Sequence, residues 1–140
     1  MSTLSAFFAQ NVAMETTEDV IVSERFKDEQ GNPIPWKLQA ISEDQNDALR
    51  KAATKRVKGR GGQHVTETDQ TEYLARLAAA SVVFPNLKDG ELQNSYGVRG
   101  AEVLIRRMLL AGEYANLLLK VQEINGFDND INELVEEAKN

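Results

Sequence analysis

Residues 87–125 decide the fold, and they read LKDGELQNSYGVRGAEVLIRRMLLAGEYANLLLKVQEIN. From residue 101 onward, apolar residues recur three and four positions apart, which places them on one face of a helix. These residues are Ala101, Leu104, Ile105 and Met108, and then Tyr114, Leu117, Leu118, Val121 and Ile124. So much apolar surface must be covered by the rest of the chain or by a partner. No residue of the stretch is chemically reactive, which favours binding over catalysis.

A glycine divides this apolar stretch. Gly112 lies near its middle, and a glycine inside a helix costs about 1 kcal/mol relative to alanine. An unbroken helix of roughly 25 residues is long for a small domain. We therefore predict a break or sharp kink at Gly112.

Length and composition limit the class of protein. The 140 residues suit a single domain, and 41% of them are hydrophobic, which excludes global disorder. The formal net charge of −6 disfavours a general nucleic-acid binder. The chain has no cysteine, no visible secretory signal and no apolar run of the roughly 18 residues that a membrane span needs. We expect a soluble, cytoplasmic protein without a membrane partner.

The first 41 residues predict an arm and a β-hairpin. Residues 1–17 form the arm, in which Leu4, Phe7 and Phe8 form one turn of amphipathic helix or pack as isolated anchors. Phe7 and Phe8 are either core residues or partner anchors, with core packing favoured. Residues 18–41 form the hairpin, because β-branched residues at 20–22 precede a turn cluster at 28–33 and an alternating stretch at 34–40. Pro35 cannot donate to a ladder, so we expect an open strand edge there.

The remaining segments predict short helices. Ser42 and Gln45 form a capping box that starts a helix fading near Lys58, and residues 59–67 read as a flexible loop. Further helices are expected at residues 68–82, at 89–95 after the cap Asp89, and at 128–140 after Gly126. The predicted fold is α+β and mainly helical, with the hairpin packed on five to six short helices.

The sequence offers little chemistry. His64 is the sole histidine, and without cysteine it cannot build an ordinary zinc site. Gly59–Gly62 lacks the ending of a phosphate loop, and the acids at 128–132 lack the glycine and glutamate of a calcium loop. We predict no catalytic residue, no metal site and no cofactor.

A basic run is the strongest local charge feature. Six cations fall within eleven residues that contain no acid: Arg50, Lys51, Lys55, Arg56, Lys58 and Arg60. Three interpretations stay open: a solvated surface, an acidic protein partner, or nucleic acid. The solvated surface is favoured, and nucleic acid is disfavoured because no aromatic residue is interleaved to stack bases.

Several segments, in their order and spacing, resemble one family. They are Val20-Ile-Val-Ser-Glu-Arg-Phe-Lys-Asp28 followed by Gly31, Pro33 and Trp36, then Val83-Phe-Pro85, Leu87-Lys-Asp89, Leu92-Gln-Asn-Ser-Tyr-Gly97, Met108-Leu-Leu-Ala-Gly-Glu-Tyr114 and Val121-Gln-Glu-Ile-Asn-Gly-Phe127. This pattern resembles the small tail assembly chaperones of long-tailed phages and prophages, in particular the XkdN-like group of Bacillus prophage elements. The resemblance covers nearly the whole chain and is weakest at residues 55–71.

The resemblance implies a function. Such chaperones bind the tape-measure protein, keep it soluble and help recruit tail-tube subunits. Their genes often make a longer product by ribosomal frameshifting, and the ending Lys139-Asn140 is compatible with a slippery codon pair. Self-association is a further option. The physical reading agrees, because a small acidic domain with surplus apolar surface suits a long, apolar helical partner.

Two sets of expectations follow. The candidate partner-binding residues are Tyr96, Leu104, Met108, Tyr114, Leu117 and Leu118, and for each of them plain core packing is at least as good an account. The rival functions are a structural tail component retained in the particle and a nucleic-acid-binding adaptor that uses the basic run. An enzyme is the least favoured class.

Overall fold

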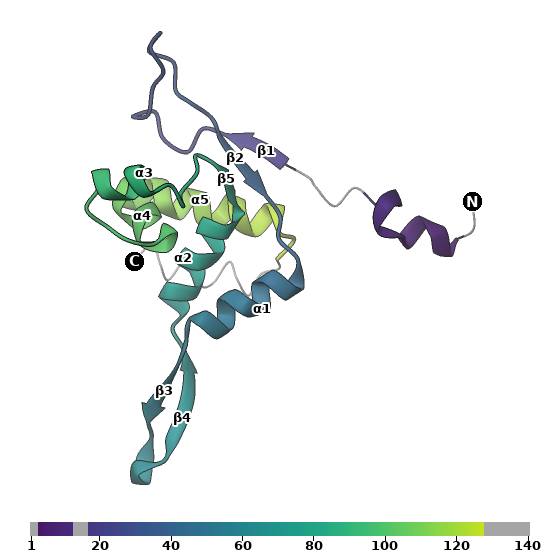
Figure 1. Cartoon of the computed structure of the whole chain (residues 1–140), viewed down its shortest axis with the longest axis vertical. Coiled ribbons are helices and arrows are strands. Elements are labelled where there is room, and N and C mark those ends of the chain that lie inside the picture. Colours follow the sequence, from purple (N-terminus) through teal and green to yellow (C-terminus); the bar gives the residue numbers. More distant parts are fainter. Residues whose placement is uncertain (1–2, 13–16, 128–140) are drawn as a thin grey trace.

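The computed structural model describes residues 3–12 and 17–127. Residues 128–140, including the predicted C-terminal helix and the Lys139-Asn140 ending, lie outside them. The architecture is α+β, as predicted, with small antiparallel sheets and a group of helices (Figure 1). None of the helices in the described part is long and apolar enough to cross a membrane.

The predicted N-terminal hairpin is confirmed, and a third strand extends it. β1 (Thr17–Val20) pairs antiparallel with β2 (Trp36–Gln39), so that Val20 lies opposite Trp36. β5 (Val82–Phe84) pairs with the other side of β2, which is therefore the central strand. The open edge expected at Pro35 was wrong, since Pro35 precedes the strand and β2 is paired on both sides.

The helices begin where their caps are. α1 (Glu43–Ala52) starts with the predicted capping box, in which Ser42 and Gln45 bond each other's backbone N–H groups. α2 (Gln70–Ser81) is capped by Asp69, and α3 (Gly90–Ser95) by Asp89. Phe84–Pro85, which follows β5, is a cis peptide bond.

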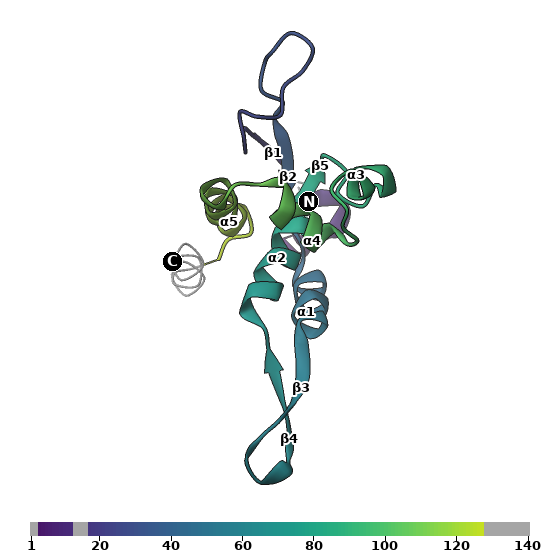
Figure 2. The same ribbon diagram turned by 90° about the vertical axis from the view of Figure 1, so that its left-hand side faces the viewer.

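Two features of residues 53–68 differ from the sequence interpretation. Helix α1 ends at Ala52 rather than near Lys58, and the loop predicted at residues 59–67 is shorter, because residues 64–67 belong to a strand. β3 (Thr54–Lys58) and β4 (His64–Thr68) instead form a second hairpin, joined through the 3-10 turn η3 (Arg60–Gly62). Figures 1 and 2 show this hairpin projecting from the body of the molecule. In sequence these residues look like a polar loop. They have a regular structure because the two strands pair with each other.

The central apolar stretch is two helices, as predicted, but the break does not lie at Gly112. α4 (Ala101–Met108) and α5 (Ala111–Ile124) are separated by two residues with extended backbone, Leu109 and Leu110. Arg25 donates to the Met108 carbonyl (2.8 Å), and Glu113 accepts from the Leu110 N–H (2.8 Å). These side chains satisfy backbone groups that the break leaves without helical partners. Gly112 lies in the first turn of α5.

The core lies between the inner face of the three-stranded sheet and helices α2, α4 and α5. Its fully buried members include Trp36, Leu38, Leu77, Leu104, Ile105 and Val121. The inner face of α2, which forms within the predicted helix 68–82, consists of buried residues: Tyr73, Leu74, Leu77, Ala78 and Ser81. One polar contact crosses this region: the Tyr73 hydroxyl donates to buried Asn46 of α1 (2.5 Å).

Residues 3–12 of the N-terminal arm, which the structure describes, do not supply core residues. The arm contains the short 3-10 helices η1 (Leu4–Phe7) and η2 (Ala9–Asn11), neither of which has a buried residue. Leu4, Phe7 and Phe8 are 67%, 75% and 45% exposed, so the preference for core packing was wrong.

Candidate functional site

The six candidate partner-binding residues lie mainly in the interior. Leu104, Met108, Leu117 and Leu118 are at most 6% exposed and belong to the core. Tyr96 and Tyr114 are partly buried and pack against it. The chain itself covers the first four in this fold, whereas Val103 and Leu110 of the same stretch are 42% and 59% exposed. Whether a partner contacts the two tyrosines stays a prediction.

Tyr114 is notable for its hydroxyl group. Its oxygen is buried, and it has no hydrogen-bond partner among the described residues. Burial raises the pKa of Tyr114 to about 12, an effect that Arg106 partly offsets. The group is therefore neutral at physiological pH and serves as a packing residue.

The basic run divides into two parts. Near the body, Arg50 and Lys51 both pair with Asp47 (3.2 and 3.0 Å), and Lys55 lies 3.9 Å from Glu72. These contacts partly neutralise the base of the second hairpin, as the solvated-surface interpretation expects.

The tip of the second hairpin keeps its charge. Arg56, Lys58 and Arg60 are exposed, and none of them forms an ion pair within the described ranges. Arg56 pairs across the hairpin with Thr66, and Lys58 with His64. Since side chains alternate along a strand, Arg56 and Lys58 share one face of the hairpin. This face is a second candidate surface.

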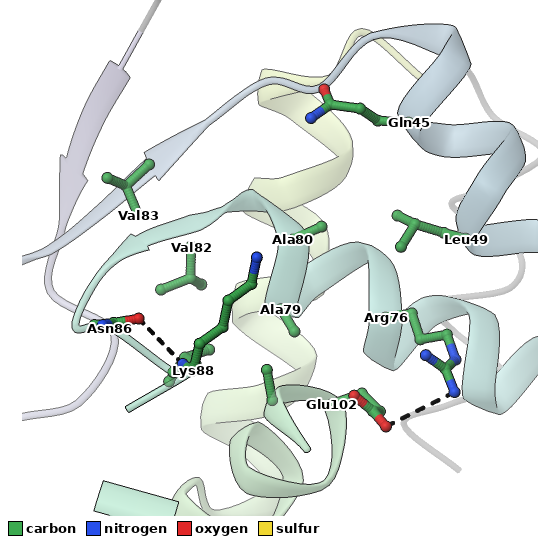
Figure 3. Close-up of a pocket in the computed structure, with 12 residues that line it drawn as sticks. Gln45, Leu49, Arg76, Ala79, Ala80, Val82, Val83, Asn86, Lys88 and Glu102 are labelled. Atoms are coloured by element: carbon green, nitrogen blue, oxygen red, sulfur yellow. Dashed lines mark hydrogen bonds and ion pairs between the residues drawn. The ribbon is translucent and has the colours of Figure 1, made fainter. Parts of the chain in front are cut away.

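A groove along α2 is a concave feature close to the family-like segments. It has a volume of about 420 Å³ and lies between α1, α2, β5 and the start of α4. Figure 3 shows Ala79 and Ala80 of α2 on one side of the groove, with Leu49 of α1 nearby. Val82 and Val83 of β5 complete its apolar part. The two alanines allow close approach of another backbone, because their side chains are small.

Charged groups lie along the edge of the groove. Arg76 of α2 lies 3.8 Å from Glu102 of α4 (Figure 3). It also lies 3.8 Å from Glu72. All three side chains are about a quarter exposed. Lys88 also lines the groove and, within the described part of the chain, has no ion-pair partner. The groove therefore combines an apolar floor with the cation of Lys88 at its edge.

The start of α4 helps to shape this groove. Gly100 has φ of +99°, a backbone conformation that side-chain-bearing residues rarely adopt. A Cβ at this position would come within 2.9 Å of a Glu102 carboxylate oxygen. Glycine at position 100 therefore allows Glu102 to lie where it meets Arg76.

The groove and the second hairpin are surfaces suited to binding. Across residues 3–12 and 17–127, no group of three or more His, Cys, Asp or Glu side chains is placed to hold a metal ion. His64 is exposed on the second hairpin. The sequence missed the groove because its lining comes from four elements that are distant in the chain. It also missed Arg25, whose contacts at the α4–α5 break have no sequence signal.

The fold and the groove describe a small binding domain, and comparison with known proteins gives its class. The chain belongs to the family of phage XkdN-like tail assembly chaperone proteins, whose model matches residues 4–139. This is a family of chaperones and not of enzymes, and its members act with phage tail proteins.

Two relatives, one of which also has a crystal structure, support this assignment. The chain is 42% identical to YqbN, an uncharacterized protein of Bacillus subtilis strain 168, over 96% of this chain and 92% of YqbN. It is 40% identical to XkdN of the phage-like element PBSX of the same strain, over 96% and 93%. A crystal structure of YqbN superposes with a TM-score of 0.78 at 34% identity, covering 91% of this chain and 99% of that one.

Proposed function

We propose that this chain binds the tape-measure protein in the host cytoplasm, keeps it soluble and assists assembly of the tail tube. Membership of the tail assembly chaperone family carries the proposal. The net charge of −6 supports it, since an acidic domain bound to an apolar chain keeps the complex dispersed. The action is stoichiometric binding, followed by release when tube subunits polymerise.

The α2 groove is the part of the surface best suited to a helical segment of the tape-measure protein. An amphipathic helix binds by laying its apolar face into a groove. Ala79 and Ala80 permit close approach, while Leu49 and Val83 provide apolar contacts on either side. Lys88 favours a partner helix that carries an acidic residue beside its apolar face.

The buried candidate residues have an indirect role in this proposal. Leu104 is fully buried on α4, and α4 packs against α2. It holds Glu102 and Ala101 in place at the groove, and it does not contact the partner.

A single substitution tests the groove. Ala80 is exposed on α2 and lines the groove, so Ala80→Arg places a long charged side chain in it while keeping a good helix former. Ala48→Arg is the matched control, because Ala48 is exposed on α1 and does not line the groove. We expect Ala80→Arg to reduce co-purification of the co-expressed tape-measure protein at least about tenfold, or ~1.4 kcal/mol. Equal recovery with Ala80→Arg and Ala48→Arg would place the partner elsewhere.

The exposed cations of the second hairpin favour a second contact. Arg56 and Lys58 share a face that suits an acidic segment of a tail protein. The double variant R56E/K58E should then weaken recovery of that protein, and salt should weaken recovery with the unaltered chain. Salt-dependent binding to RNA or DNA, lost in the same variant, would instead support the nucleic-acid adaptor.

A further inference from the structure

A small apolar cavity lies on the molecule away from the α2 groove. It has a volume of about 140 Å³ and is lined only by apolar side chains, among them Phe26, Trp36, Leu92 and Met108. An apolar cavity of about 150 Å³ binds benzene in another protein, so this one has room for about one phenyl ring. It is too small to take a helix, which separates it from the groove proposed for the tape-measure protein.

The apolar surface continues beyond the cavity. Phe84 lines it and is 51% exposed. A partner segment that inserts a ring into the cavity would therefore find further apolar surface at the rim of the cavity. The residues next to the ring in that segment would be covered by this surface.

The N-terminal arm carries the side chains that match this cavity. Phe7 is 75% exposed, and Leu4, Phe8 and Val12 are 67%, 45% and 39% exposed. No residue of η1 or η2 is buried, and Figure 1 shows these short helices standing apart from the body. Exposing several large apolar side chains within ten residues is unfavourable, and such a cluster marks a contact surface.

We propose that the chain self-associates by inserting the Phe7 ring of one copy into the apolar cavity of a second copy. The size of the ring matches the cavity, and the cavity is lined by hydrophobic residues. Each chain has both halves of the contact, so two identical chains are sufficient. The proposal does not depend on the chaperone function, because purified chain alone tests it.

The strand register favours a second copy over the same chain. Val20 at the end of β1 lies opposite Trp36, which lines the cavity, whereas Thr17 at the start of β1 lies opposite Gln39. The arm precedes Thr17 and therefore joins the sheet at the end remote from the cavity. Reaching its own cavity would require the arm to run back along β1.

Sedimentation of the full chain over a range of concentrations tests the proposal. We expect the average mass of the unaltered chain to rise above that of one chain with concentration. Phe7→Ser should weaken this association at least about tenfold, which corresponds to ~1.4 kcal/mol. Val103→Ser is the matched control: Val103 is also an exposed apolar residue, at 42%, and lies outside the cavity, so association should be unchanged.

A second variant tests the cavity side. Leu92→Phe fills the cavity from within and should also abolish association, with an unchanged far-UV circular dichroism spectrum as the check on folding. Mixing Phe7→Ser with Leu92→Phe should restore association, because one partner supplies an intact cavity and the other an intact arm. A single-chain mass at every concentration, or association unaffected by Phe7→Ser, would overturn the proposal. A change in Trp36 fluorescence on Phe7→Ser that is independent of concentration would show insertion into the chain's own cavity and would also overturn it.

Discussion

Leu104 provides the sharpest test of how the central apolar stretch is used. Its side chain is fully buried on α4, in the core shared with α2. Leu104→Ala removes three carbon atoms and leaves a cavity that the neighbouring side chains fill only in part. Substitutions of this kind cost about 2–5 kcal/mol, and complete burial places this one near ~3 kcal/mol. That is a large share of the ~5–15 kcal/mol by which a domain is usually stable.

The assay is urea denaturation, monitored through the fluorescence of Trp36. Trp36 is the sole tryptophan and is 2% exposed. With a urea dependence of roughly 2 kcal/mol per molar, the midpoint should fall by about 1.5 M. The control is Val103→Ala on the same helix, where the side chain is 42% exposed. Its effect should stay within about 0.5 kcal/mol.

The reasoning is refuted if Leu104→Ala costs less than about 1 kcal/mol and yet abolishes binding of the tape-measure protein. That result would mean that Leu104 faces the partner and that the core assignment is wrong. If binding falls only in proportion to the loss of folded protein, Leu104 acts through the fold.

Three further predictions concern contacts that the sequence did not reveal. The hydrogen bond from Arg25 holds the pKa of Glu113 at about 2, below its ordinary value of 4.5. Glu113 therefore stabilises the fold above about pH 4.5, and this contribution is lost as the pH falls toward 2. Glu113→Gln should therefore lower the thermal midpoint at pH 7 and flatten its decline in acid, and an unchanged acid profile would contradict this. Tyr73→Phe removes the hydrogen bond to buried Asn46 and should cost about 1–2 kcal/mol in urea denaturation; a neutral result would show that Asn46 finds another partner. Gly126→Ala should cost about 1 kcal/mol because φ at this position is +73°, and a stabilising effect would argue against the left-handed helix end.

Local signals in the sequence predicted elements well where a cap or a turn fixes the backbone. Ser42 and Asp89 each precede a helix in the structure, as predicted from their hydrogen-bonding groups. The turn at residues 28–33 forms as expected, with Asp28 accepting from the N–H groups of Gln30 and Asn32.

Features that depend on distant segments were not predictable in the same way. β5 has only three residues, and its strand conformation depends on pairing with β2. The break after Met108 lies at Leu109 rather than Gly112, because Leu109 is buried and Arg25 caps the end of α4 from more than eighty residues away. The free-energy cost of a glycine inside a helix, taken alone, predicted the break at the wrong residue.

The second hairpin shows a different limit. Residues 54–68 contain many cations, glycines and polar residues, which is the composition of a mobile loop. Their strand structure arises from cross-strand pairing, for example Val57 with Val65, and from a hydroxyl contact between Thr54 and Thr68 (2.7 Å). Such pairs have no signature when each segment is considered alone.

The candidate partner-binding residues show why periodicity cannot separate a core face from a binding face. Leu117 and Leu118 have the spacing of a buried stripe, and the same spacing serves a surface that a partner covers. The groove that replaces them in our account depends on exposed residues with weak apolar character, chiefly Ala79 and Ala80. It becomes visible only after α1, α2, β5 and α4 are assembled.

The solubility of the tape-measure protein in cells tests the central claim most directly. The measurement is the fraction of tape-measure protein in the supernatant when it is expressed alone, with this chain, or with an unrelated acidic domain of similar size. We predict that most of it is soluble, and bound to this chain in a fixed ratio, only when this chain is present. An equal soluble fraction in all three cases, with no complex recovered, would contradict the account.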